Sequence, residues 1–162
     1  MSGLAHPGDP RRTARTAAVR TVISDGMSDL ALTPVGRVES ALTDRAAAPR
    51  QADEAAPPAW LVFDGRYADA LSDLEPGADL LLFTWLDRAD RTVQRVRPRG
   101  DPARRETGVF STRSPDRPNP IGLHRVTVRA VEGLRVEVAN LEALDGTPIL
   151  DLKPVLGPLA ER

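Results

Sequence analysis

The sequence contains no cysteine, and only two of its 162 residues are histidine, His6 and His124. The absence of cysteine excludes disulfide bonds and thiolate metal sites, and two histidines do not make a histidine-rich metal centre. We therefore expect a function that needs neither a metal nor a thiol nucleophile.

Aromatic residues are also scarce, at 4% of the chain, although 41% of the residues are hydrophobic. The core must therefore consist mainly of Leu, Val and Ala. No apolar run approaches the ~18 residues that a membrane span needs, and the N-terminus lacks the apolar segment of a secretion signal. We expect a soluble, cytoplasmic protein with one domain, since 162 residues suffice for a sizeable core.

Acidic and basic residues nearly balance, giving a formal net charge of -1. The chain as a whole is not a polycation, so contact with nucleic acid would need a local basic patch. Residues 88–105 offer one, because seven arginines stand there against two aspartates. Prolines and a glycine break any regular structure in this segment. It is either a phosphate-binding surface or a solvated loop.

Residues 1–26 are rich in Ala, Arg, Gly and Pro and offer few side chains that can pack. We therefore expect a disordered tail over residues 1–30, followed by a folded domain over residues 31–158. Met27 opens a more protein-like stretch and could be an alternative translation start.

Short apolar runs between turn residues predict three strands, at residues 32–40, 60–63 and 80–86. Gly36 could mark a bulge in the first of them, and the third is apolar enough to be buried on both faces. Residues 67–74 have apolar side chains at helical spacing and predict one short helix. Residues 41–58 lack periodicity and predict a long loop, which in a compact domain is usually functional or mobile.

A hairpin is predicted over residues 125–138. A three-residue loop at residues 131–133 would pair Val128 with Val136, collect the valines on one face, and put Gly133 at the left-handed position of a G1-bulge loop. A further short strand is expected at residues 149–152, after a tight turn.

The pattern contains no alternating strand–helix units, no Gly-x-Gly-x-x-Gly and no Walker loop. We therefore predict a mainly β fold class: a single-domain, antiparallel, barrel-like sheet with one or two short helices and a disordered N-terminal tail.

Residues 108–123, Gly-Val-Phe-Ser-Thr-Arg-Ser-Pro-Asp-Arg-Pro-Asn-Pro-Ile-Gly-Leu, form the most unusual stretch. It begins as a short apolar strand. Three prolines then fix φ and remove three backbone donors, so the following loop is stiff. It carries two arginines, Arg113 and Arg117. Such a loop is either a ligand-binding segment or a rigid surface connection.

This stretch closely resembles the signature of the TsaA/TrmO-like family. Residues 144–154, Leu-Asp-Gly-Thr-Pro-Ile-Leu-Asp-Leu-Lys-Pro, resemble a second motif of the family, and Pro49-Arg50-Gln51 a third. The resemblance covers roughly residues 32–156. It implies a compact, mainly β barrel-like domain that binds S-adenosylmethionine and works as a homodimer. Characterised members methylate the exocyclic nitrogen of threonylcarbamoyladenosine next to the tRNA anticodon.

The resemblance also implies which residues bind the cofactor. They are Pro49, Arg50, Gln51, Asp79, Leu80, Arg113, Leu123, Leu144, Asp145, Gly146 and Thr147. Three nearby positions depart from the family pattern: Asp79 stands where the family usually has His, His124 where it has Ser, and Val155 where it has Tyr. These departures cluster around the expected cofactor and acceptor pocket; they do not argue against cofactor binding, and the acceptor side is where divergence would appear.

The chemistry of S-adenosylmethionine agrees with several of these positions. Either Arg113 or Arg50 could hold its carboxylate bidentately. Either Asp145 or Asp79 could meet its ammonium group or ribose hydroxyls, and backbone groups of the turn at Leu144 could contact the adenine edge. The alternatives are an ordinary turn and surface ion pairs.

Methyl transfer from a sulfonium is an in-line displacement that needs alignment, desolvation and removal of a proton from the acceptor nitrogen. Asp87 and Asp116 are the candidate proton acceptors, although each could equally be a solvent-exposed carboxylate. Three functions remain open: a tRNA N6-adenosine methyltransferase, a transferase acting on a small-molecule acceptor of secondary metabolism, and a non-catalytic S-adenosylmethionine-binding protein.

Overall fold

The computed structural model describes residues 19–20, 31–46 and 56–157. Packing divides the chain into two units, Met1–Thr33 and Pro34–Arg162. In the first unit, β1 (Val19–Arg20) pairs antiparallel with β2 (Ala31–Leu32). The disordered tail expected over residues 1–30 lies, apart from β1, outside the described residues.

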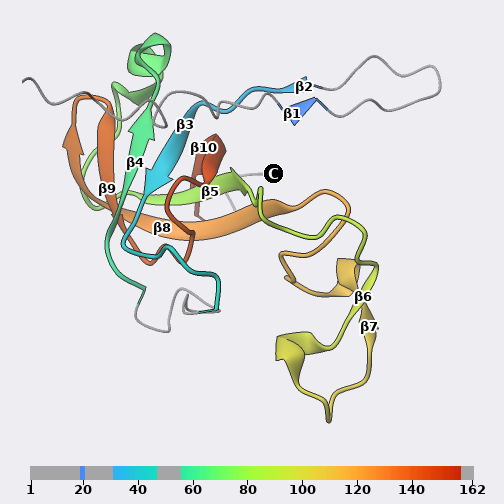
Figure 1. Ribbon diagram of the computed structural model, residues 1–162. Coiled ribbons are helices and arrows are strands. Elements are labelled where there is room, and N and C mark those ends of the chain that lie inside the picture. The colour runs from blue at the N-terminus through green and yellow to red at the C-terminus, as the bar shows by residue number, and fades with distance from the viewer. Residues whose placement is uncertain (1–18, 21–30, 47–55, 158–162) are drawn as a thin grey trace, which may run out of the picture. The chain divides into compact units, whose positions relative to one another are not determined.

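Six strands of the second unit pair antiparallel and close into a barrel in the order β10-β3-β4-β9-β8-β5 (Figure 1). They are β3 (Gly36–Glu39), β4 (Ala59–Phe63), β5 (Asp79–Trp85), β8 (Ile121–Glu132), β9 (Arg135–Ala139) and β10 (Pro148–Pro154). This confirms the predicted mainly β, antiparallel fold. No helix in the part of the chain that the structure describes has the length and apolar run that a membrane span requires.

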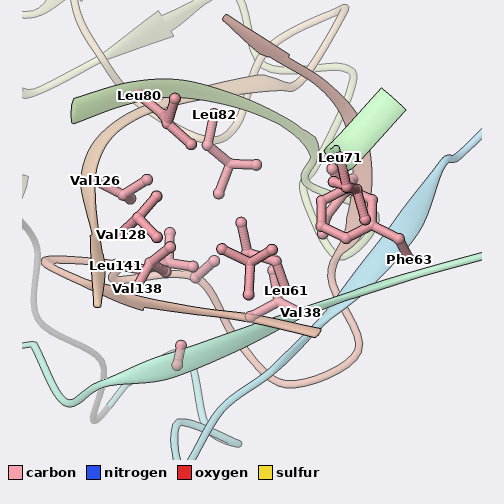
Figure 2. Packing of buried hydrophobic residues seen from close by; sticks show 14 residues of the cluster. Val38, Leu61, Phe63, Leu71, Leu80, Leu82, Val126, Val128, Val138 and Leu141 are labelled. Atoms are coloured by element: carbon pink, nitrogen blue, oxygen red, sulfur yellow. The ribbon is translucent and has the colours of Figure 1, made fainter. Parts of the chain in front are cut away.

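The barrel is filled by aliphatic side chains that point inward from every second strand position. Figure 2 shows Leu80 and Leu82 from β5 facing Val38 and Leu61 from β3 and β4. Valine suits this packing because its branched side chain fills a pleated, buried surface. The interior therefore consists mainly of Leu, Val and Ala, as the scarcity of aromatic residues predicts.

The apolar run in β5 alternates in burial, so the prediction that both of its faces are buried is wrong for the outer face. Leu80 and Leu82 point into the barrel, whereas Leu81 and Phe83 are only half-buried. β5 pairs with β8 on one side and β10 on the other.

The hairpin of β8 and β9 differs from the predicted three-residue loop. Glu132 pairs with Arg135, so the loop has two residues, and a register shift between Val128 and Ala130 pairs Val128 with Val138. The shift is a bulge, and it changes which face the later residues of β8 occupy. A two-residue loop is therefore enough to bring the inward-facing valines of the two strands together. Gly133 does have a positive φ, of 60°.

The predicted first strand is also interrupted, since β2 ends at Leu32 and β3 begins at Gly36. A Cβ at Gly36 would collide with the backbone of Val62 in β4, so glycine permits this close pairing. The predicted helix is a 3-10 helix, Gly65–Leu71. Asp64 caps its N-terminus, because the Asp64 side chain accepts from the backbone N–H of Arg66.

The segment between β5 and β8 holds a second small sheet (Figure 1). β6 (Arg95–Val96) pairs with β7 (Thr107–Gly108), and a 3-10 turn, Pro98–Gly100, lies between them. A second 3-10 turn, Val109–Ser111, follows β7 directly. The expected apolar strand at the start of residues 108–123 is therefore a strand end followed by a 3-10 turn.

Candidate cofactor and acceptor site

The turn 144–147 is joined by hydrogen bonds to the segment that follows β3. The backbone N–H of Asp145 donates to the carbonyl of Leu42 at 2.7 Å, and that of Gly146 donates to Val38 at 2.8 Å. The Asp145 side chain accepts from the backbone N–H of Ser40 at 3.1 Å. Gly146 has a φ of 80°, which glycine adopts without strain. The turn is thereby fixed against residues 40–46.

Arg88 strengthens this junction. Its guanidinium donates to the carbonyl of Thr43 at 3.0 Å and to that of Asp145 at 3.4 Å. Residues 40–46 lead directly to Pro49, Arg50 and Gln51, which lie outside the described residues. The structure therefore places residues 40–46, which precede one expected cofactor motif, in contact with the turn 144–147, which is another.

The proline-rich loop (residues 112–120) is tied to the same segment. Arg45 forms an ion pair with Asp116 at 2.6 Å, and the second carboxylate oxygen of Asp116 accepts from the backbone N–H of Asp90 at 2.8 Å. The hydrogen bond from Arg45 lowers the pKa of Asp116 against a smaller opposing effect of burial. Residues 40–46, the proline-rich loop and the turn 144–147 thus converge.

The two arginines of the proline-rich loop have different surroundings. Arg117 donates to the carbonyls of Ser114 at 2.7 Å, of Val109 at 3.0 Å and of Thr112, so it holds the loop together. Arg113 is exposed and makes no hydrogen bond or ion pair with any other described residue. Of the two, Arg113 is the one available to a ligand.

Asp79, at the start of β5, is engaged within the fold. Thr127 donates to one of its oxygens at 2.7 Å, and Arg125 donates to the other at 2.8 Å. These two contacts, that of Thr127 first, lower the pKa of Asp79. Its neighbour Leu80 points into the core and is 2% exposed. In this structure the side chains of both residues serve the barrel.

The remaining predicted cofactor residues lie in two places, on the outer face of β8 and in the turn 144–147. Leu123 lies on the outer face of β8 and is 43% exposed. Leu144 is half-buried, and Thr147 is buried in the turn, where its carbonyl accepts from the backbone N–H of Val38 at 2.9 Å. The backbone of this turn, more than its side chains, faces the converging segments.

A group that the sequence did not suggest lies inside the barrel beside Leu123. His124 Nε2 lies 2.9 Å from the hydroxyl of Thr84, and His124 Nδ1 lies 2.8 Å from Glu142 Oε1. We call this the Thr84–His124–Glu142 chain. The sequence signals this chain of contacts only through His124, which departs from the family pattern, and the structure shows that His124 shares the inward side of β8 with Val126.

The charge of Glu142 is stabilised by its neighbours. Burial acts to raise the pKa of Glu142, but the hydrogen bond and charge of His124 outweigh it, helped by the charge of Arg113, and the pKa is lowered. An ionised carboxylate can only accept, so His124 Nδ1 is the donor to Glu142. Glu142 Oε2 is buried and has no hydrogen-bond partner among the described residues.

A carboxylate, an imidazole and a hydroxyl in series resemble a hydrolase triad, but the Thr84–His124–Glu142 chain is not a catalytic triad. Thr84 is 0% exposed, so no substrate can reach its hydroxyl. Gly122 packs over it: a Cβ there would collide with Thr84 Oγ1 and lie 2.7 Å from His124 Nε2. The exposed end of the chain is Glu142, whose side chain is 23% exposed.

The two candidate proton acceptors differ in their surroundings. Both oxygens of Asp116 are occupied and its pKa is lowered, which favours a role in holding the loops. Asp87 is exposed, two residues beyond the end of β5. The assignment of either residue as the base stays a prediction.

The arginines of residues 88–105 are less uniform than the sequence suggests. Arg88 is used at the junction, and Arg91 donates to the carbonyl of Pro118 at 2.9 Å and stacks on Trp85. Arg95 and Arg104 make exposed ion pairs. Arg105 is exposed. Positive charge is thus kept on the surface, mainly in the segment around β6 and β7.

The sequence is similar to a described protein family and to named proteins of other organisms. Residues 37–159 match the family model described as the tRNA-methyltransferase O N-terminal domain. A protein of Archaeoglobus fulgidus named S-adenosyl-L-methionine-binding protein is 41% identical over 122 residues, which are 75% of this chain and 86% of that protein. A mouse protein named tRNA (adenine(37)-N6)-methyltransferase is 53% identical over 51 residues, which are 32% of this chain and 12% of that protein.

A solved structure gives the same picture for the fold. The crystal structure of TrmO from Pseudomonas aeruginosa matches with a TM-score of 0.65 and 29% identity, over 86% of this chain. The chain spans 60% of the length of that protein.

Proposed function

Because the chain belongs to the family of tRNA-methyltransferase O N-terminal domains, we propose that it is an S-adenosyl-L-methionine-dependent methyltransferase. The relatives named for binding this cofactor support the proposal, and so does the structural similarity to TrmO. The acceptor that best agrees with the family is the N6 atom of threonylcarbamoyladenosine next to the anticodon of a tRNA.

The observation that carries this proposal is the convergence of three distant segments. The Arg45–Asp116 ion pair and the Ser40–Asp145 hydrogen bond join residues 40–46, the proline-rich loop and the turn 144–147. Each segment belongs to, or leads to, a motif expected to bind the cofactor.

The residues present fit the groups of the cofactor. The guanidinium of Arg113 suits a carboxylate, and the backbone of the turn 144–147 suits the adenine edge or the ribose. When bound, S-adenosyl-L-methionine supplies a methyl group that is already activated on a sulfonium. The protein needs to align the acceptor nitrogen, exclude water and take one proton, and Asp87 remains the exposed candidate for the last step.

The basic surface agrees with a nucleic-acid acceptor. Arg95, Arg104 and Arg105 lie in the segment between β5 and β8 and carry their charges at the surface. Phosphate contacts of this kind give affinity without sequence specificity. We propose that this segment contacts the tRNA backbone.

A homodimer, expected from the family resemblance, is part of the proposal. Ile121 and Leu123 lie side by side on the outer face of β8 and are 44% and 43% exposed. Apolar side chains exposed together are typical of an association surface. Sedimentation at micromolar protein concentration tests this point, and a monomer would contradict it.

A small-molecule acceptor is the second candidate, and one observation favours it. Arg88 and Arg91 donate to backbone carbonyls of neighbouring loops, so fewer of the seven arginines of residues 88–105 are left for a ligand than the sequence suggests. If the acceptor is a small molecule, replacing Arg95 and Arg105 by Ala leaves turnover unchanged. If it is a tRNA, the same change lowers affinity and reduces its dependence on salt.

Methyl transfer from labelled S-adenosyl-L-methionine tests the function. We expect label in tRNA that carries threonylcarbamoyladenosine and none in tRNA that lacks this modification. Label in neither tRNA, with binding of S-adenosylhomocysteine intact, would rule out the tRNA acceptor and leave the small-molecule or non-catalytic function. Absence of S-adenosylhomocysteine binding would reject the whole proposal.

A further inference from the structure

Glu142 Oε2 is a buried carboxylate oxygen without a partner among the described residues. Buried polar atoms are almost always hydrogen-bonded, because an unpaired one costs stability. The other oxygen, Oε1, is held by His124 at 2.8 Å. The arrangement therefore fixes one oxygen, and among the described residues it leaves the second unpaired at the end of a side chain that is 23% exposed.

The surroundings of Glu142 point to the cofactor. Glu142 lies two residues before Leu144, the first residue of the turn 144–147. His124, which holds it, directly follows Leu123. Arg113 is close enough for its charge to lower the pKa of Glu142, yet the two side chains form no ion pair. The charge of Arg113 therefore acts on Glu142, while the hydrogen-bond partner of Glu142 is His124.

The aspartates expected to meet the ammonium group are less available. Asp79 is bound by Thr127 and Arg125. One oxygen of Asp145 is used by the backbone N–H of Ser40. Among the described residues, Glu142 is the acidic side chain that has a buried oxygen without a hydrogen-bond partner.

We propose that Glu142 Oε2 accepts a hydrogen bond from the α-ammonium group of the cofactor while Arg113 holds its α-carboxylate. His124 is the positioning residue that orients Glu142, and Thr84 orients His124. The inference rests on the proposed binding of S-adenosyl-L-methionine. An amino-acid group carries its two opposite charges on adjacent positions, which is what a neighbouring guanidinium and carboxylate complement.

Calorimetry with two probes tests the assignment. The first is S-adenosylhomocysteine, and the second is its desamino analogue, in which hydrogen replaces the amino group. Glu142→Gln would turn an amide N–H₂ toward the ammonium group. We expect it to weaken S-adenosylhomocysteine binding by about 10- to 100-fold, as for loss of a charge-assisted hydrogen bond, and to leave binding of the desamino analogue unchanged. Glu75→Gln, at an exposed position, is the matched control.

The outcomes separate this inference from the function on which it rests. If the wild-type protein does not bind S-adenosylhomocysteine, both fail. If the wild type and Glu142→Gln bind S-adenosylhomocysteine equally well, only the assignment of Glu142 fails. A lower turnover of Glu142→Gln with that unchanged affinity would instead assign Oε2 to the amino group of the acceptor. Equal weakening of both probes also overturns it, since that reports a general disturbance of the site.

The role of His124 has its own readout. Asn can place an N–H near the position of His Nδ1, whereas Leu cannot. We expect His124→Asn to retain S-adenosylhomocysteine affinity and His124→Leu to lose it, with the desamino analogue unaffected by either. Equal affinities in the two variants would refute the positioning role. If a variant does not fold, the wild-type protein can still overturn the assignment, because an ammonium group held by Glu142 requires the desamino analogue to bind about 10- to 100-fold more weakly, and equal affinity for the two probes would contradict it.

Discussion

Arg45 and Asp116 form an ion pair of 2.6 Å that joins the segment after β3 to the proline-rich loop, 71 positions away in the chain. Asp116 also accepts from the backbone of Asp90, so one carboxylate holds three stretches of the chain together. Such a residue acts on a ligand site through geometry. The same residue is a candidate proton acceptor, and the two roles predict different kinetics.

We expect Asp116→Asn to raise the dissociation constant for S-adenosylhomocysteine and to cost about 0.5–1 kcal/mol of stability, as for a partly exposed ion pair. Its effect on the chemical step should be small. Single-turnover methyl transfer at saturating cofactor measures that step. A loss of the chemical rate with unchanged cofactor affinity would instead identify Asp116 as the base.

Asp79→Asn tests whether Asp79 contacts the cofactor. The side chain is already bound by Thr127 and Arg125, so we expect a small loss of stability and unchanged affinity for S-adenosylhomocysteine. Thr127→Val removes the stronger of the two influences on the pKa of Asp79 and should reproduce the effect on stability. A marked loss of affinity for S-adenosylhomocysteine in Asp79→Asn, but not in Thr127→Val, would show that Asp79 contacts the cofactor.

Arg113→Ala should weaken binding of S-adenosylhomocysteine by about 1.5–3 kcal/mol, the usual contribution of a hydrogen bond to a charged group. Stability should be unaffected, because Arg113 makes no contact that holds the proline-rich loop. Arg117→Ala is the contrasting variant: it removes the donor to Val109 and Ser114 and should lower the melting temperature. Unchanged calorimetric affinity in the Arg113 variant would exclude it from the site.

The fold class could be predicted because it depends on local patterns. The short apolar runs of β4 and β5 are visible in the sequence, and both became strands close to the expected bounds. The register of the β8–β9 hairpin could not be predicted, because the bulge between Val128 and Ala130 changes the facing of all later residues. No local pattern marks a bulge that lacks glycine.

The site was predictable in its motifs and not in its contacts. The motifs indicated Arg113 and the turn 144–147, and the structure brings that turn to the segment leading to Arg50. The partners of Asp79 and the pairing of His124 with Glu142 depend on how β8 registers with β5 and on the path of the chain after β9. Such pairings arise only when the barrel closes, so sequence spacing carries no trace of them.

The lowered pKa of Glu142 predicts how stability depends on pH. A carboxyl group whose pKa is lower in the folded state contributes stability above its unfolded pKa and loses it as the pH falls through the folded value. For Glu142 this loss begins below its ordinary value of 4.5. Urea unfolding between pH 3 and pH 6 should therefore show a steeper acid loss in the wild type than in Glu142→Gln. Parallel curves would show that Glu142 is not held as an anion by His124.

Gly122 gives the sharpest test of the packing around the Thr84–His124–Glu142 chain. Gly122→Ala would drive a methyl group against Thr84 Oγ1 and to 2.7 Å from His124 Nε2. Both side chains are almost fully buried and cannot move away, so we expect a loss of about 1–3 kcal/mol in the free energy of unfolding. Gly108→Ala is the matched control, since nothing lies within 4 Å of a Cβ there and its φ is negative. If both variants unfold at the same urea concentration, the close packing of Thr84 and His124 against Gly122 is wrong. If Gly122→Ala alone is destabilised and also loses S-adenosylhomocysteine affinity, the chain from Thr84 to Glu142 transmits the displacement to the cofactor site.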